Sequence, residues 1–84
     1  MHVEFFGIPR ERAGVAELEL DVVTLGDALA AIAARFPALR DLIGAGCLHS
    51  SVAANLNGDV FIRDPNTTLG ANDRVILLSS DAGG

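Results

Sequence analysis

The sequence predicts an α+β fold in which a small mixed sheet of four to five strands packs on one main helix. Segments with alternating apolar residues occur in both halves of the chain, which is the pattern of half-buried strands. Between them, residues 25–36 carry apolar residues at helical spacing. A chain of 84 residues supplies one small core. We therefore expect residues 1–79 to form one domain and residues 80–84 to form a flexible tail.

The first two strands are predicted near the start of the chain. Val3 and Phe5 alternate with polar neighbours, and residues 7–9 (Gly-Ile-Pro) break the run. Apolar residues then recur at every second position from Leu18 to Val22, which indicates a strand with one buried face. Because the link between the two runs is short, we expect them to form a hairpin.

The main helix is predicted to follow directly. Apolar residues recur three or four positions apart from Leu25 to Phe36. Thr24 is placed to cap the first turn, and Asp27 lies three residues later, where a capping box has its acid and the helix dipole favours negative charge. Pro37 disfavours helical backbone at the residue before it, so the helix is expected to end near Phe36.

Three further strands are predicted in the second half, which completes a β-grasp arrangement. Residues 52–56 lead into Asn57-Gly58, a strong signal for a tight hairpin, and residues 60–62 form the returning strand. The last strand, residues 74–79, is apolar on both sides, as central strands are. Since one helix covers one face of the sheet, the other face either lies under a loop or exposes an apolar patch that marks a docking site.

Composition excludes several classes of function. The net charge is −5, and the six basic residues are scattered arginines, so we expect no nucleic-acid binding. The excess of acidic over basic residues favours binding to a partner with a basic docking site. Alternatively, it contributes only to solubility. Cys47 is the single cysteine, which excludes a disulfide framework or a zinc site and fits a reducing compartment. With no signal peptide or membrane span in the sequence, we expect a cytoplasmic protein without a metal.

The segment that carries chemistry is the final Gly83-Gly84. A tail that threads a narrow channel needs residues without side chains that accept unusual backbone angles. Attack of the terminal carboxylate on the α-phosphate of ATP would give an acyl-adenylate at Gly84, and a sulfur nucleophile could displace AMP to leave a thiocarboxylate. The sequence carries no phosphate loop or positioned base, so we expect the chain itself to be no enzyme and a partner to activate it.

Four segments, taken in order, resemble the β-grasp sulfur-carrier family (MoaD/ThiS-like, ubiquitin-like), above all the small subunit of molybdopterin synthase. The matching segments are residues 6–14 (Phe-Gly-Ile-Pro-Arg-Glu-Arg-Ala-Gly), 52–58 (Val-Ala-Ala-Asn-Leu-Asn-Gly), 70–75 (Gly-Ala-Asn-Asp-Arg-Val) and 82–84 (Ala-Gly-Gly). The sequence departs from the family at residues 79–81, where Ser-Ser-Asp stands in place of Pro-Pro-Val. Asp81 thus puts a charge where an apolar residue usually packs.

The resemblance implies a function and a set of partners. A ubiquitin-activating-type adenylyltransferase would use ATP to adenylate Gly84, a sulfur donor protein would supply sulfur for the thiocarboxylate, and the large subunit of molybdopterin synthase would receive it to build molybdopterin. No cofactor would be bound to the chain itself. The open sheet face would bind both partners through Val60, Ile76 and Leu78, with Asp81 and Ala82 beside the diglycine.

Three other functions stay open at the level of sequence. The chain could carry sulfur for another pathway, such as the synthesis of thiamine, cysteine or a specialised metabolite. It could be a protein modifier joined to lysines of targets, or a β-grasp binding module with an idle tail. Because the sequence contains no lysine, chains of copies linked through side-chain amines are disfavoured.

Overall fold

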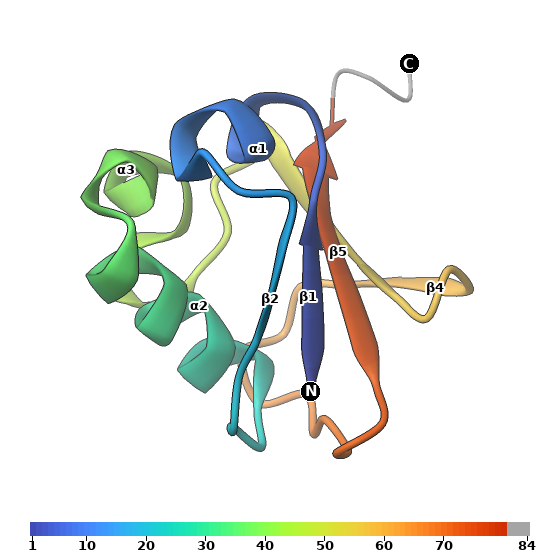
Figure 1. The fold of residues 1–84 in the computed structure, drawn as a ribbon. Helices are drawn as coiled ribbons and strands as arrows, with labels where there is room; N and C mark the ends of the chain where they lie inside the picture. The colour runs from blue at the N-terminus through green and yellow to red at the C-terminus, as the bar shows by residue number, and fades with distance from the viewer. Residues whose placement is uncertain (81–84) are drawn as a thin grey trace.

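Five strands form one mixed sheet in the order β2-β1-β5-β3-β4 (Figure 1). The computed structural model describes residues 1–80, except for the side chain of Ala45. The strands are β1 (His2–Phe5), β2 (Glu17–Glu19), β3 (Val52–Leu56), β4 (Val60–Ile62) and β5 (Arg74–Ser79). The pair β1–β5 is parallel, and the pairs β1–β2, β3–β5 and β3–β4 are antiparallel. The predicted α+β fold and the central place of the last strand are confirmed.

The main helix, α2 (Leu25–Arg35), lies against one face of the sheet, on the same side as α3 (Arg40–Ile43) (Figure 1). Its predicted N-cap is confirmed, because the Thr24 hydroxyl accepts the Asp27 N–H at 3.1 Å. Phe36 ends the helix before Pro37, also as predicted. Short turns of helix, η1 (Pro37–Leu39) and η2 (Gly44–Gly46), flank α3.

The core lies between this helical layer and the sheet. Alternate strand residues face the helices and are almost fully buried, including Val3 and Phe5 of β1 and Val75 and Leu77 of β5. The buried face of α2 consists of Leu25, Ala28, Leu29, Ile32 and Ala33. Among residues 1–80, none of the helices has the length and hydrophobicity that crossing a membrane requires.

The link between the first two strands differs from the prediction. β1 and β2 pair antiparallel as expected, but residues between them form a helix, α1 (Gly7–Ala13), and not a simple turn. Gly7 has φ +61°, which lets the chain turn sharply out of β1. Pro9 lies in the first helical turn, where a missing N–H leaves no hydrogen bond unmade. Gly14 ends the helix in the left-handed conformation, and its N–H donates to the Arg10 carbonyl at 2.9 Å.

The β3–β4 hairpin forms at the predicted place, and residues 60–62 form the returning strand as predicted. Asn57 and Gly58 have φ of +60° and +74°, and the Asp59 N–H donates to the Leu56 carbonyl at 3.0 Å. A two-residue loop would pair Leu56 with Asp59. The observed partner of Leu56 is Val60, so the returning strand is displaced by one residue. A displacement of one residue exchanges the faces of all the side chains that follow.

Candidate docking surface and the root of the tail

The end of β5 is anchored on two sides. Ser79 is 8% exposed, and its Oγ accepts the N–H of Ile8 in α1 at 3.0 Å. Ser80, which we expected to begin the flexible tail, donates its N–H to the Ser51 carbonyl and its hydroxyl to the Ser50 carbonyl, both at 2.9 Å. The anchored body therefore extends one residue beyond the predicted boundary, because Ser80 has backbone acceptors within reach.

Four of the predicted site residues lie beyond this point. Asp81, Ala82, Gly83 and Gly84 are outside the described residues. The fixed position of Ser80 nevertheless limits where they can act. Four residues span at most about 14 Å when fully extended. Any chemistry at Gly84 would therefore take place within that distance of Ser80.

The face of the sheet opposite α2 carries the second predicted feature. Ile76 and Leu78 alternate with the buried residues of β5 and lie on this face, half-buried. Asn55 of β3 is paired with Ile76, and the same Asn55 is paired with Phe61 of β4. Phe61 is thus on the same face as Ile76, and 64% of its surface is exposed.

Phe6 adds a second aromatic ring to this face. It follows the buried Phe5 in extended backbone, so its side chain points to the other side of the sheet, and it is 47% exposed. We call the set Phe6, Phe61, Ile76 and Leu78 the open-face cluster. Both aromatic members were missed from the sequence. The alternation of β1 pointed to Phe6, whereas Phe61 depended on the register of the hairpin.

Val60 is placed differently from the other predicted contact residues. It is paired with Leu56, which lies on the helix side of the sheet, so Val60 belongs to that side although it is 51% exposed. The structure brings Ile76 and Leu78 together and sets Val60 apart from them. The displaced register of the β3–β4 hairpin is the physical reason.

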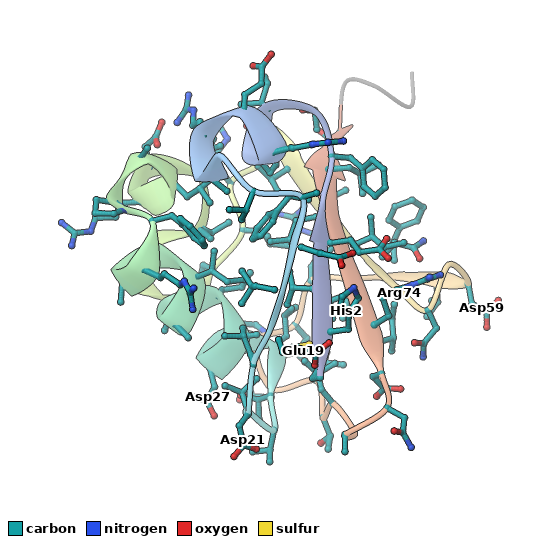
Figure 2. The ribbon with its side chains drawn as sticks, in the orientation of Figure 1. His2, Glu19, Asp21, Asp27, Asp59 and Arg74 are labelled. Atoms are coloured by element: carbon teal, nitrogen blue, oxygen red, sulfur yellow. The ribbon has the colours of Figure 1, made fainter. Side chains whose placement is uncertain are left out.

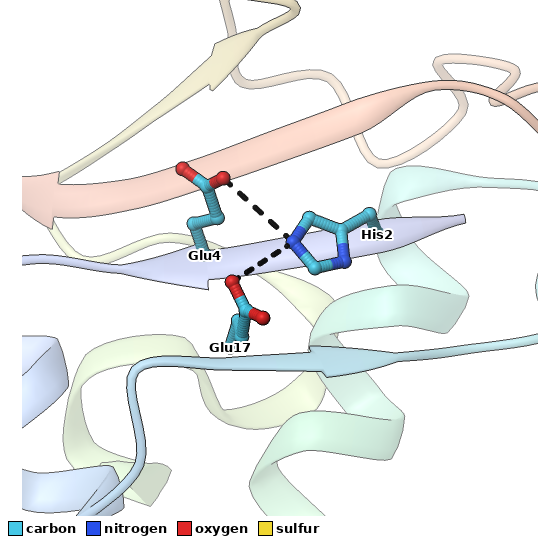
Figure 3. A group of neighbouring side chains, drawn as sticks. All are labelled: His2, Glu4 and Glu17. Atoms are coloured by element: carbon cyan, nitrogen blue, oxygen red, sulfur yellow. Dashed lines mark ion pairs between the residues drawn. The ribbon is translucent and has the colours of Figure 1, made fainter.

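A polar cluster borders the open-face cluster on β1 and β2. The His2 Nδ1 lies 2.5 Å from the Glu19 carboxylate, and its Nε2 lies 3.7 Å from Glu4 and 3.4 Å from Glu17 (Figures 2 and 3). The hydrogen bond to Glu19 is the main cause that raises the pKa of His2 above its usual value. Arg74 approaches Glu4 at 3.7 Å from the neighbouring strand. The open-face cluster therefore has an edge rich in carboxylates.

The same polar cluster contains the atoms best placed to hold a metal ion among the described residues. One ligand atom each from His2, Glu4 and Glu17 lies within 4.8 Å of the other two (Figure 3). The Arg74 guanidinium offsets part of the carboxylate charge, as does the His2 imidazole when it is protonated. The arrangement is accounted for by ion pairing between neighbouring strands.

A shallow hollow lies beside α3. It has a volume of about 300 Å³ and is lined by Arg40, Asp41, Leu42, Gly44, Cys47, Leu48 and His49. Cys47 is an exposed free thiol, and the His49 Nδ1 lies 2.9 Å from the Ser51 hydroxyl. His49 is thus engaged with Ser51.

The fold, the anchored end of β5 and the exposed apolar sheet face define a small β-grasp protein of the ubiquitin-like class. The chain belongs to the ThiS family, whose model matches residues 3–84. A comparison with curated proteins finds no match.

Solved structures show the same fold. The crystal structure of SAMP1 from Haloferax volcanii is 28% identical, with a TM-score of 0.79 over 99% of this chain and 97% of that one. The solution structure of the small archaeal modifier protein 1 (SAMP1) from Methanosarcina acetivorans is 26% identical, with a TM-score of 0.80 over 99% and 94%. Urm1 from Sulfolobus solfataricus, 19% identical with a TM-score of 0.71 over 94% and 99%, shares the fold.

Proposed function

We propose that the chain is a sulfur carrier whose Gly84 carboxylate is adenylated by a partner enzyme and then converted to a thiocarboxylate. The observation that carries the proposal is the family match, which runs through residue 84 and so includes the diglycine. The anchoring of Ser79 and Ser80 supports it, because it fixes the root of a short arm at one end of the sheet. A partner that binds the folded domain at that end can then admit residues 81–84 into its own active site.

The activation step requires a second protein. A carboxylate oxygen of Gly84 attacks the α-phosphate of ATP, pyrophosphate leaves, and the mixed anhydride with AMP is formed. A sulfur nucleophile then adds to the carbonyl carbon and AMP departs with the bonding electrons. We propose a ubiquitin-activating-type adenylyltransferase for the first step and a sulfur donor protein for the second, with ATP consumed on the partner.

We propose the open-face cluster as the surface on which this partner docks. Large exposed aromatic and aliphatic side chains are the groups whose burial drives protein association. The carboxylates of Glu4 and Glu17 at its edge favour a partner whose apolar patch is flanked by basic residues. Asp81 and Ala82 would contact the channel that admits Gly84. Val60 would contribute to binding if the partner also contacts the helix side of the β3–β4 hairpin.

We propose more specifically that the chain delivers its sulfur to molybdopterin through the large subunit of molybdopterin synthase. The four sequence segments that resemble the small subunit of that enzyme support it. Sulfur delivery for thiamine, cysteine or a specialised metabolite is the alternative acceptor pathway. Co-purification of a native partner separates these, because each pathway has a different sulfur acceptor.

A second function is favoured by a specific observation. Two structures similar to this chain are of small archaeal modifier protein 1, from Haloferax volcanii and from Methanosarcina acetivorans, each at 26% identity. Attachment of Gly84 to lysines of target proteins would use the same adenylate, with an amine in place of the sulfur nucleophile. The two functions therefore share one activated species and differ in the nucleophile that consumes it.

Incubation with ATP, an activating enzyme and sulfide tests the sulfur-carrier function. We expect the intact mass to rise by the difference between sulfur and oxygen, and the gain to disappear when a sulfur acceptor is added. Lysine-linked adducts on target proteins, with no gain of sulfur, would favour the modifier function. An unchanged mass and no adduct, with an enzyme that activates a known carrier in parallel, would contradict both.

A further inference from the structure

We propose that Asn55 determines which partners bind the open-face cluster, because its carboxamide oxygen needs a hydrogen-bond donor that the fold does not supply. Among residues 1–80, the Asn55 Oδ1 is the one buried side-chain nitrogen or oxygen atom that has no hydrogen-bond partner. This assignment rests on the proposed function, in which the activating enzyme docks on that cluster. It adds the chemistry by which the enzyme would recognise the surface.

Asn55 belongs to a row of paired residues that crosses the open face of the sheet. Ile76 of β5 is its partner on one side, and Phe61 of β4 is its partner on the other. Beyond Ile76 the row continues to Glu4 of β1 and Glu17 of β2. The row is therefore acidic at one end and aromatic at the other, and the Asn55 carboxamide lies between two apolar side chains.

The neighbours of Asn55 explain why its oxygen is left without a partner. The two apolar side chains beside it in the row offer no donor. Arg74 lies two residues before Ile76 on the same face of β5, but its guanidinium approaches the Glu4 carboxylate at 3.7 Å. The backbone N–H of Arg74 donates to the Asn57 Oδ1 at 2.8 Å. The nearby donors of β5 are thus engaged with other acceptors.

An unpaired buried acceptor destabilises the free protein, because the oxygen has lost its hydrogen bonds to water without gaining others. A partner that donates an N–H to this oxygen restores the missing bond in the complex, whereas a partner with only apolar groups at that point does not. Side-chain rotamers at interfaces commonly change on binding. Movement of the exposed Phe61 ring on docking can therefore uncover the oxygen.

The row also indicates where a basic group of the partner should lie. Neighbouring strands are about 4.8 Å apart, so Glu4, which is two strands from Asn55, lies about 10 Å from it along the row. The partner that fits is a protein surface with an N–H donor among apolar side chains and a basic side chain about 10 Å to one side. Such a donor distinguishes the activating enzyme from other proteins that expose apolar patches.

Three substitutions at residue 55 test the proposal through the affinity for a ubiquitin-activating-type adenylyltransferase, measured by calorimetry without ATP. Asn55→Leu removes the acceptor and keeps a side chain of similar size, and Asn55→Ala removes the acceptor without adding bulk. Asn55→Asp keeps oxygen acceptors and removes the amide N–H groups. We expect Asn55→Leu and Asn55→Ala to bind about tenfold or more weakly than wild type, and Asn55→Asp to retain most of the affinity.

Urea denaturation of the unbound variants separates recognition from a structural role. Because the oxygen is unpaired in the free protein, Asn55→Leu should have a denaturation midpoint equal to or higher than that of wild type, although it binds more weakly. A residue that only stabilises the fold would lower the midpoint when it is replaced. The opposite directions of the two changes are the signature of an acceptor that is reserved for a partner.

Wild-type affinity in Asn55→Leu would overturn the proposal, and so would a lowered midpoint for that variant, which would show that the oxygen has a partner within the chain. An equal loss of affinity for Asn55→Asp would assign recognition to the amide N–H groups and would also overturn it. The gain of sulfur by the wild-type chain is measured separately. Sulfur gain with unchanged binding of Asn55→Leu contradicts this proposal alone, whereas binding that depends on Asn55 without sulfur gain contradicts the proposed function alone. A wild-type chain that does not bind the enzyme contradicts both.

Discussion

Gly7 and Ser79 lie so close that there is no room for a side chain at residue 7. A Cβ atom on Gly7 would be 2.7 Å from the Ser79 Oγ, which itself accepts the Ile8 N–H at 3.0 Å. Gly7 also has φ +61°, a backbone conformation that L-residues disfavour. This contact joins the first turn of α1 to the last residue of β5, and so it fixes the point from which the tail begins.

We expect Gly7→Ala to destabilise the protein more than Gly14→Ala does. Both glycines have positive φ, which costs an alanine about 1–2 kcal/mol. Only Gly7 has a close neighbour, because nothing lies within 4 Å of a Cβ on Gly14. Moving the Ser79 hydroxyl away also breaks its hydrogen bond, at a cost of about 1 kcal/mol. Urea denaturation of the two variants measures the difference.

A double variant separates the contact from backbone strain. Gly7→Ala combined with Ser79→Ala removes the hydroxyl that a Cβ would meet, so the two changes should be non-additive. Gly44→Ala is the neutral control, because Gly44 has neither a positive φ nor an atom within 4 Å of its Cβ position. Equal losses for Gly7→Ala and Gly14→Ala would show that the contact with Ser79 contributes nothing.

Phe61→Ser is expected to weaken binding of the activating enzyme about tenfold or more, as removal of a central aromatic contact does. Phe61 is exposed on the open face, with Asn55 of β3 between it and Ile76, so its loss should leave the free energy of unfolding nearly unchanged. Val60→Ser is the matched control, since Val60 is a neighbouring exposed residue on the other face. Titration calorimetry or competition with the wild-type chain gives the affinities. A larger loss for Val60→Ser would place the docking surface on the helix side.

Thr24→Ala should lower the free energy of unfolding by about 1 kcal/mol, because it removes the side-chain acceptor at the start of α2. Thr24→Ser retains the hydroxyl and should lose much less. Thermal and urea denaturation of the pair measure the effect. If both variants were equally destabilised, the methyl group of Thr24 and not its hydroxyl would be responsible.

Asp73 should make stability depend on pH under acidic conditions. Its pKa is lowered from 3.8, first by the hydrogen bond from the Gly70 N–H and then by the one from the Asn57 amide. Since the folded state binds the proton less readily, the stabilisation is present above pH 3.8 and is lost as the pH falls through the lower folded value. Asp73→Asn should therefore be less stable than wild type at neutral pH and approach it below pH 3.8. A difference that stayed constant with pH would contradict the ionic origin.

The sequence predicted the elements whose periodicity is imposed by a single buried face. Residues 3, 5, 75 and 77 alternate because the helices cover one side of β1 and β5, and α2 follows its apolar stripe. α1 escaped prediction because Gly7 and Pro9 are typical of turns, whereas here both fall where a short helix accepts them. Packing of this segment against β5, through Ile8 and Ser79, is a tertiary effect that local propensity does not contain.

Only part of the candidate docking surface could be predicted from the sequence, and tertiary pairing is again the reason. Ile76 and Leu78 followed from alternation within one strand, while Phe61 and Val60 depended on how β3 and β4 align. Asn57-Gly58 signals the turn but does not fix whether Leu56 meets Asp59 or Val60. The pairing observed in the fold, and not the turn residues, decides which aromatic or aliphatic group joins the open-face cluster.

Peptide mapping of the chain after activation with ATP and sulfide locates the new sulfur atom. Cleavage after arginine releases residues 75–84 as the last peptide and separates them from residues 41–63, which contain Cys47. We expect one oxygen to be replaced by sulfur in peptide 75–84, and no such change in a chain that ends at Gly83. Sulfur found only on the peptide that contains Cys47, or a chain ending at Gly83 that is converted equally well, would contradict a carrier that acts through Gly84.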